Sequence, residues 1–486
     1  MVIIVYSAET GESIAANLGR PDYSYYFVSK AFRPVLRRFA HVIDTLHPER
    51  DVDVIYEKCR SMAEPCVFLS FSPPQGTPTG LKCPTISVFA WEFPTVPTDP
   101  FAGDDRYDWR NVFRQHGCAI THSSVAVRAV REAMGNDFPV WSIPAPVWDD
   151  YATLHEKGEA TARSNGIDLT FVGRLVDFNG CDIPSVPEEH RKDFIEDRSL
   201  PRTDQPVRVH LDGVIYTTVF NPADGRKNWR DLVSGFVWAF RALADATLVL
   251  KVVHYDYAEV RDLVTDEVLK LLPFKCRVIV LHGYLSDRAY STLMRQSTYV
   301  VNASYGEGQC LPLMESMSAG RPAISPAHTA MEDYVNESNA FVVRSSGERV
   351  WWPHDPRRAF RTTRYRIDWE SLRQAYVDSY EVAKNDPARY ARMSRCAVER
   401  LQGYCSKTLV EERLKRVLRE RGFVGEDSRV ARRTSWRIAV RLTVEMWRMS
   451  LSRKPRSLTS ATTANGVQAR TALRFRAMIV WLFGKT

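Results

Sequence analysis

A chain of 486 residues, 44% hydrophobic and 26% charged, is typical of a globular protein and is too long for one ordinary core. No apolar run is long enough to span a bilayer, and the start lacks the basic region and cleavage site of a signal peptide. The nine cysteines are scattered with no C-x-x-C pair, which argues against a zinc site and indicates reduced thiols in the cytoplasm.

The net charge of +8 is concentrated at one end of the chain. Residues 427–486 contain 13 Lys and Arg and 2 acids, so residues 1–426 carry a net charge of −3. Because the basic residues belong to a tail, the charge does not favour nucleic-acid binding by the whole protein. We expect no nucleic-acid partner.

Short apolar runs alternate with helical patterns in the first 148 residues. Strands are predicted by the runs at 2–6, 66–72, 85–91, 117–123 and 139–148. Apolar residues at helical spacing predict helices over 28–43 and 123–135, the second closed by Gly135. This alternation predicts a doubly wound, parallel-sheet, Rossmann-like domain over residues 1–148.

Residues 149–212 are polar and broken, and we interpret them as a linker and insertion. A second Rossmann-like domain is predicted over residues 213–421. Its strands are expected at 213–220, 246–253, 276–284, 297–304 and 320–326. Helices are expected at 229–243, 257–272 and 287–296, and long amphipathic helices from 368 to 421 close the domain.

One stretch of the second domain combines several signals. The strand at 297–304 ends at the carboxyl edge of the sheet, where open α/β sheets bind ligands. The chain then turns at Gly306 and Gly308, and Pro312 suits the first turn of a helix that ends at Gly320. The start of such a helix favours a phosphate, because its N–H groups are free. Two carboxylates, Glu307 and Glu315, flank this turn.

Two glutamates at this spacing are usually solvated when they stand alone, but their surroundings are specific. Glu307-x7-Glu315 within GEGQCLPLMESMSAGRPAIS resembles the E-x7-E signature of retaining GT-B glycosyltransferases, above all glycosyltransferase family 4. The resemblance implies that Glu307 binds the transferred sugar and Glu315 the ribose. It also implies donor contacts from the residues between them, which are Gly308, Gln309, Cys310, Leu311 and Pro312. Gln309 and Cys310 replace the family's Phe and Gly.

A second segment, TTVFNPADGRKNWRDLVSGFVWAF at 217–240, resembles the basic strand–loop–helix of the same family. Arg226 and Lys227 are therefore expected to neutralise the donor diphosphate, and with Glu307 they form the predicted catalytic set. The family's Arg five residues before the Lys is Pro222 here, so Lys227 is the stronger candidate and Arg230 a substitute. The G-R-L at Arg174 resembles the start of this motif but belongs to the insertion.

The amino-terminal half offers weaker candidates for contacts with the acceptor or the sugar. Gly11 follows the first strand, where the family has a glycine loop. Trp91 and Glu92 follow the third strand, and His122 follows the fourth. His122 and His328 are equally well interpreted as satisfied histidines at the edge of the cleft.

The resemblance implies a GT-B fold, with two Rossmann-like domains facing a cleft and carboxy-terminal helices crossing back. It implies transfer from a nucleotide-diphosphate sugar to a glycan or lipid-linked acceptor in surface polysaccharide synthesis, with retention and with no metal or cofactor. The departures at Gln309, Cys310 and Pro222 leave open an inactive scaffold in a glycan-assembly complex. A nucleotide-sugar epimerase of the same fold is a third interpretation.

Residues 422–486 form a basic tail in which Arg alternates with apolar and Trp residues. One interpretation is a peripheral contact of residues 430–486 with anionic lipid on the inner face of the membrane, by an otherwise cytoplasmic protein. The alternative is a helix packed back on the domains, followed by a poorly ordered end.

Overall fold

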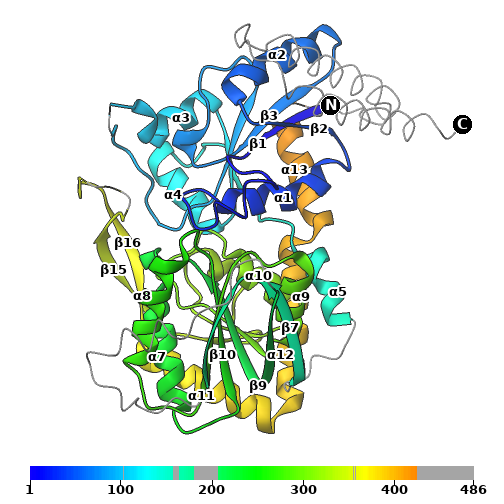
Figure 1. The fold of residues 1–486 in the computed structure, drawn as a ribbon. Coiled ribbons are helices and arrows are strands. Elements are labelled where there is room, and N and C mark those ends of the chain that lie inside the picture. Colours follow the sequence, from blue (N-terminus) through cyan, green and yellow to red (C-terminus); the bar gives the residue numbers. More distant parts are fainter. Residues whose placement is uncertain (102, 157–163, 180–205, 354, 356, 424–486) are drawn as a thin grey trace, which may run out of the picture. The chain divides into compact units, whose positions relative to one another are not determined.

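The computed structural model contains two α/β domains, each built around its own sheet (Figure 1). We refer to residues 1–147 as the amino-terminal domain and to residues 164–385 as the carboxy-terminal domain. The structure describes residues 1–101, 103–156, 164–179, 206–353, 355 and 357–423. Residues 424–486 of the predicted basic tail (422–486) lie outside this part of the chain, as do the interpretations attached to them.

The amino-terminal sheet has six parallel strands in the order β2-β1-β3-β4-β5-β6. They are β1 (Val2–Tyr6), β2 (His41–Thr45), β3 (Cys66–Phe71), β4 (Thr85–Phe89), β5 (Ala119–Thr121) and β6 (Val140–Ser142). Every residue of β3 and β4 is buried, as expected for central strands of a parallel sheet with both faces covered. The predicted doubly wound sheet is confirmed.

The helices of this domain are α1 (Ser24–Leu36), α2 (Pro48–Ser61), α3 (Trp109–His116) and α4 (Ser124–Met134), with 3-10 turns η1 (Pro74–Gly76) and η2 (Asp105–Tyr107). α4 begins as predicted, because the Ser123 side chain accepts from the Ala126 N–H. The helix predicted over 28–43 is wrong at its end. It stops at Leu36, and β2 then pairs with β1 along its whole length.

The carboxy-terminal sheet follows the order β14-β13-β12-β9-β10-β11-β8, with β7 pairing with β9. Its strands are β7 (Ser164–Val172), β8 (Arg174–Asn179), β9 (Pro206–Phe220), β10 (Ala246–Val252), β11 (Arg277–His282), β12 (Tyr299–Val301), β13 (Ala323–Ser325) and β14 (Ala340–Val342). Six of these are parallel, and β7 and β8 are antiparallel additions.

The interpretation of residues 149–212 as irregular insertion is therefore corrected for its described parts. β8 extends the sheet by pairing with β11, and β7 pairs with the first half of β9. β9 consequently begins at Pro206 rather than at 213. Leu169, Phe171 and Val209 are buried with Leu281 in one cluster. These strands stay in place because they cover apolar surface of the parallel sheet.

Helices cover this sheet and connect the domains. They are α5 (Trp148–Glu156), η4 (Gly225–Lys227), α7 (Trp229–Phe240), α8 (Tyr257–Leu269), α9 (Asp287–Gln296), α10 (Leu311–Ser318), η5 (Thr329–Asp333), α11 (Trp369–Asn385), α12 (Pro387–Cys405) and α13 (Lys407–Glu420). None of the helices within the described residues is long and apolar enough to cross a membrane.

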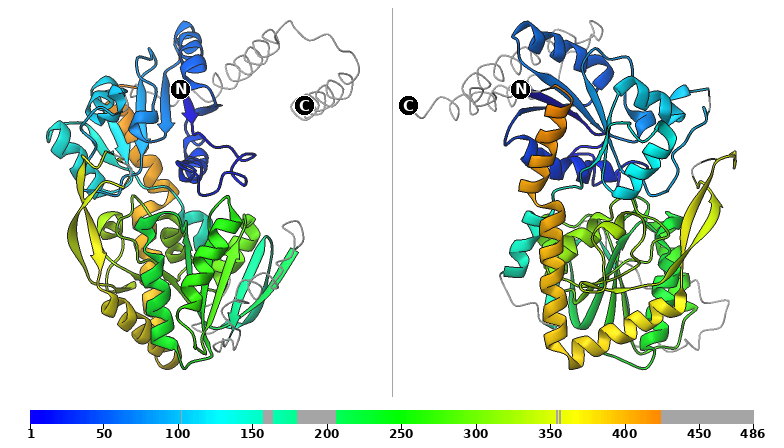
Figure 2. Two further views of the ribbon diagram at one scale, coloured as in Figure 1. Left: turned by 60° about the vertical axis from the view of Figure 1, so that its left-hand side comes forward. Right: turned by 180° about the vertical axis from the view of Figure 1, so that it is seen from behind.

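The closing helices return to the amino-terminal domain, as predicted. α12 and α13 run along both domains in the right-hand view of Figure 2. Val410 and Leu414 of α13 are buried in the same core cluster as Phe32 of α1. The Tyr404 hydroxyl donates to the His122 carbonyl at 3.0 Å, so the crossing is fixed by hydrogen bonds as well as by apolar contact. Two Rossmann-like domains with helices that cross back confirm the predicted fold.

A hairpin of β15 (Ser345–Trp351) and β16 (Arg361–Ile367) was not expected from the sequence. It links the two domains, because the Thr95 hydroxyl donates to Thr362 Oγ1 at 2.9 Å. The rings of Trp352 and Trp91 lie 5.8 Å apart at the same contact.

Candidate active site

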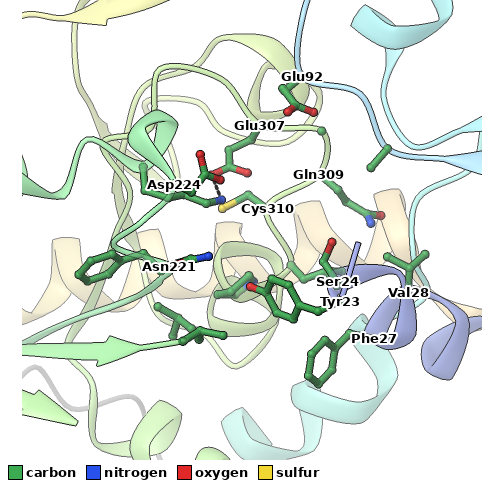
Figure 3. Close-up of a pocket in the computed structure, with 18 of the residues that line it drawn as sticks. Tyr23, Ser24, Phe27, Val28, Glu92, Asn221, Asp224, Glu307, Gln309 and Cys310 are labelled. Carbon is green, nitrogen blue, oxygen red and sulfur yellow. Dashed lines mark hydrogen bonds and ion pairs between the residues drawn. The ribbon is translucent and has the colours of Figure 1, made fainter. Parts of the chain in front are cut away.

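A cleft of about 1560 Å³ lies between the two domains and is lined by residues of both. Figure 3 shows Tyr23, Ser24 and Glu92 of the amino-terminal domain facing the same space as Asp224 and Glu307 of the carboxy-terminal domain. The lining includes nearly every donor-site candidate, namely Arg226, Lys227, Glu307, Gly308, Gln309, Cys310, Leu311, Pro312 and Glu315.

Two loops bring these candidates together because they leave adjacent parallel strands. β9 and β12 pair directly, so the loops that follow them start at the same carboxyl edge. The Tyr305 N–H of the second loop donates to the Arg226 carbonyl of the first at 2.8 Å. In the first loop the Asp224 carboxylate accepts from the Arg226 N–H and so starts the short turn η4. This geometry places residues 80 positions apart within contact distance.

Lys227 and Glu307 form an ion pair at the wall of the cleft. The Lys227 Nζ lies 2.7 Å from Glu307 Oε1, and the Ser304 hydroxyl donates to the same oxygen at 2.6 Å. Burial alone would lower the pKa of Lys227, but the Glu307 carboxylate outweighs it and raises that pKa above its ordinary value. Lys227 is therefore a fixed cation that faces the cleft.

Arg226 lines the same wall but is held by other groups. Its Nη2 donates to Asp224 Oδ2 at 2.7 Å, and its Nη1 lies 3.2 Å from Glu92 Oε1 and donates to the Gly306 carbonyl at 3.0 Å. Burial opposes its charge, but Glu92 and Asp224 together raise its pKa. The guanidinium thus connects the two domains, and less of its charge is available to a ligand than that of Lys227.

Glu315 lies in the second turn of α10 and faces the cleft between two tyrosines. The Tyr290 hydroxyl donates to Glu315 Oε2 at 2.6 Å. Burial raises the pKa of Glu315 to about 7, and hydrogen bonds from Tyr290 and Tyr151 limit the rise. This carboxyl therefore changes its protonation close to neutral pH.

Gln309 and Cys310, the departures from the family pattern, both lie in the wall. Gln309 Oε1 accepts from the Ala145 N–H of the amino-terminal domain. Gln309 Nε2 is buried and has no acceptor among the described residues, and Asn302 Nδ2 is in the same situation. Burial, and then the Glu307 charge, raise the pKa of the Cys310 thiol, so it stays protonated. Two amide donors thus stand ready for ligand oxygens.

Two glycines of the motif are explained by the close approach of the domains. A Cβ atom on Gly308 would lie 2.8 Å from the Trp91 backbone nitrogen, and one on Gly306 would lie 2.9 Å from the Glu92 carbonyl oxygen. Real Cβ atoms are essentially never this close to a backbone atom. These positions therefore require glycine for contact rather than for an unusual φ.

The weaker candidates of the amino-terminal domain divide into two groups. Trp91 and Glu92 line the cleft. The Trp91 ring is 4% exposed and packs on Trp109 at 4.4 Å, and its Nε1–H donates to the Thr95 carbonyl. Trp91 is thus a packing residue beneath the cleft, whereas Glu92 is the partner of Arg226.

Gly11 and His122 are not part of the cleft wall, and their predicted contacts are corrected. The nearest neighbour of a Cβ on Gly11 would be the Tyr26 hydroxyl at 3.3 Å. His122 is fully buried, and its Nδ1–H donates to the Ile143 carbonyl oxygen at 2.8 Å. Burial lowers the pKa of His122 to about 4, so the ring is neutral. His122 is thus a buried core residue, and its Nε2 has no hydrogen-bond partner among the described residues.

The sequence interpretation missed Asn302 and Lys251, which both line the cleft. Each carried a signal: Asn302 is the first polar residue after the apolar run YVV, and Lys251 interrupts the apolar run ATLVLKVV. Within the described ranges no group of three or more His, Cys, Asp or Glu could hold a metal ion.

Residues 229–350 match the family described as "Glycosyl transferases group 1". The match includes the Glu307–Glu315 motif and begins just after Lys227. This segment of the carboxy-terminal domain is therefore similar to the group 1 glycosyltransferases, and the predicted resemblance is confirmed over residues 229–350. No curated protein matches the chain by sequence.

Three solved structures of similar fold are 9 to 13% identical to this chain. A sucrose-phosphate synthase from Thermosynechococcus elongatus has a TM-score of 0.49 at 13% identity, with 86% of this chain and 98% of that chain covered. Anabaena Alr3699/HepE in complex with UDP-glucose has a TM-score of 0.48 at 11% identity, with coverage of 86% and 99%. S. aureus TarM, in complex with UDP among others, has a TM-score of 0.44 at 9% identity, and this chain covers 57% of its length.

Proposed function

We propose that the protein is a retaining glycosyltransferase that moves a sugar from a nucleotide-diphosphate sugar to a glycan or lipid-linked acceptor. One observation carries the proposal: Lys227, Glu307 and Glu315, two of them in the segment that matches the family, line one cleft between two Rossmann-like domains. A fixed cation, a neighbouring carboxylate and a second carboxyl suit a ligand with a phosphate end and hydroxyl groups.

In the proposed complex the donor diphosphate lies against Lys227. Glu307, held by Lys227 and Ser304, accepts hydrogen bonds from hydroxyls of the transferred sugar. Glu315 accepts hydrogen bonds from the ribose, next to the Tyr290 hydroxyl. The amide groups of Gln309 and Asn302 donate to further oxygens of the donor.

In the transfer step the bond between the anomeric carbon and the diphosphate oxygen breaks on the face where the acceptor oxygen bonds to that carbon. The acceptor hydroxyl proton passes to the departing phosphate, so no protein nucleophile is required. Lys227 stabilises the charge that develops on the diphosphate, and a preorganised cation can contribute about 3–4 kcal/mol to such a step. We propose that neither a metal nor a cofactor is needed for it.

We place the acceptor on the side of the amino-terminal domain, with a role in surface glycan synthesis. The eight described cysteines are free thiols, which suits a cytoplasmic protein. Contact of residues 430–486 with anionic lipid remains a proposal that rests on their sequence. Flotation of the full chain with vesicles of phosphatidylglycerol, compared with vesicles of phosphatidylcholine, tests it.

A thermal-shift screen of nucleotide sugars tests the main proposal, because a ligand that binds only the folded state raises the melting temperature. The best donor is then incubated with candidate acceptors, and NMR of the product reports the anomeric configuration. We expect transfer with retention. An inverted product refutes the mechanism, and an epimer formed without acceptor indicates an epimerase. Arg226 is paired with Glu92 and Asp224, which leaves Lys227 as the main cation for the leaving group. Donor binding without transfer would therefore favour the alternative function, an inactive scaffold in a glycan-assembly complex.

A further inference from the structure

Lys251 is a buried lysine on the floor of the cleft. It is the penultimate residue of β10, a strand in which every residue is buried, and its register partners are Val219 of β9 and Leu281 of β11. The residue is 4% exposed, yet it lines the cleft that also contains Lys227. A buried lysine near the carboxyl end of a central parallel strand is unusual, because an ammonium group is costly to remove from water.

The other lysines that line the cleft have acidic partners, whereas Lys251 has none among the described residues. Lys227 pairs with Glu307 and Lys30 with Asp287. Lys251 Nζ donates only to the carbonyl of its neighbour Val252, at 2.8 Å, and no carboxylate in the described part of the chain pairs with it. Two of its three donor positions are therefore unused.

Among the described residues, the charged groups that shift the pKa of His282, Lys251 included, are all basic. His282, at the end of β11, has its pKa lowered to about 4 by burial and then by the charge of Lys251. Arg174 and His254 also act on His282, and neither is an acid. Burial lowers the pKa of Lys251 itself to about 7. An anion in the cleft would restore the charge of this lysine.

The position of Lys251 also fits a gap in the sequence pattern. The basic residue expected five positions before Lys227 is Pro222, two residues past the end of β9. Lys251 is one residue from the end of the adjacent strand at the same edge of the sheet, since the last residue of β10, Val252, is opposite Phe220 in the register. A cation near the end of β10 thus lies beside the strand from which the loop with Pro222 and Lys227 leaves.

We propose that Lys251 is a second cation for the diphosphate of the donor, acting with Lys227. The inference rests on the proposed function and assigns it a further binding residue. Lys251 has no acidic partner among the described residues, and a phosphate of the bound donor would supply one. Affinity for the donor is then gained at the expense of stability of the empty protein.

Isothermal titration calorimetry of the full chain with UDP, GDP, ADP and inorganic pyrophosphate tests this proposal. Lys251→Met keeps the length of the side chain and removes the charge, and Lys275→Met, on the exposed surface, is the matched control. We expect Lys251→Met to weaken the tightest of these ligands at least tenfold, while its melting temperature stays equal to or above that of the wild type. At pH 8, titrations in buffers of different ionisation enthalpy should show more proton uptake in the wild type than in Lys251→Met.

The outcomes separate the two proposals. If the wild type binds none of the four ligands and no nucleotide sugar, the proposed function is refuted, and this inference with it. If the wild type binds and Lys251→Met binds within twofold of it with unchanged proton uptake, only the inference about Lys251 is refuted. A variant that loses melting temperature in parallel with affinity also refutes it, because the lysine would then be structural.

Discussion

The ammonium group of Lys227 lies 2.7 Å from a carboxylate oxygen of Glu307, and the two side chains are 20% and 6% exposed. A partly buried ion pair contributes little net stability, because desolvation of the two charges offsets their attraction. Removal of one partner is more costly, since the other charge is left without a counterion. We therefore expect this ion pair to contribute more to ligand binding than to the stability of the fold.

Single and double variants of this pair should separate stability from activity. We expect Lys227→Met and Glu307→Gln each to lower transfer about 100-fold, because each removes a group proposed to contact the donor. Lys227→Met should also lower the free energy of unfolding by about 1–3 kcal/mol. The double variant should regain stability but not activity. Chemical denaturation and initial rates measure both quantities. Arg230→Met is the control, because Arg230, the substitute candidate, pairs with Glu267 and does not line the cleft.

Glu315 should make the stability depend on pH near neutrality. Its folded pKa of about 7 lies above the value of an unfolded glutamate, so the native state binds the extra proton between about pH 4.5 and 7. The contribution of this carboxyl to stability is thus full below that window and is lost as the pH rises through it. We expect Glu315→Gln to be more stable than the wild type by about 1–3 kcal/mol at pH 8 and to differ little from it at pH 4.5. Urea unfolding at both pH values measures this, and equal differences at the two would contradict the titration.

His122 should act in the opposite direction. Its folded pKa of about 4 lies below that of an unfolded histidine, so its contribution is full above about pH 6.5 and is lost as the pH falls toward 4. We expect wild-type stability to fall relative to that of His122→Gln by about 2–3 kcal/mol across this window. Transfer per folded molecule at pH 7.5 should be unchanged, because the ring contacts Ile143 and not the cleft. A loss of transfer activity without loss of folded protein would indicate that His122 contributes to the active site.

Gly308 should report on how closely the domains must approach. The added methyl of Gly308→Ala would lie 2.8 Å from the Trp91 backbone nitrogen, so the two loops must separate. We expect a loss of about 1–3 kcal/mol in stability and about tenfold in transfer rate. Melting curves and initial rates test this. Gly403→Ala in α12 is the control, since nothing lies within 4 Å of its added methyl.

Much of the fold could be predicted because local sequence patterns indicated most of its strands and helices. Continuous apolar runs marked β1, β3, β4, β10 and β11, and turn residues bounded them. The missed elements depend on partners that are distant in sequence. β2 is a strand because it pairs with β1, and β8 is a strand because β11 offers an edge. Neither segment differs enough from its neighbours in local composition to reveal this.

The residues of the carboxy-terminal domain that suit a phosphate and hydroxyl groups could be named from the sequence, because the motif around Glu307 and Glu315 lies within one strand–turn–helix segment. The partners of these and other side chains depend on the folded arrangement. Arg226 is paired with Glu92, His122 lies in the core, and Lys251 lines the cleft with no counterion in the part of the chain that the structure describes. Burial and charge pairing are properties of the space between elements, and spacing along one chain does not record them.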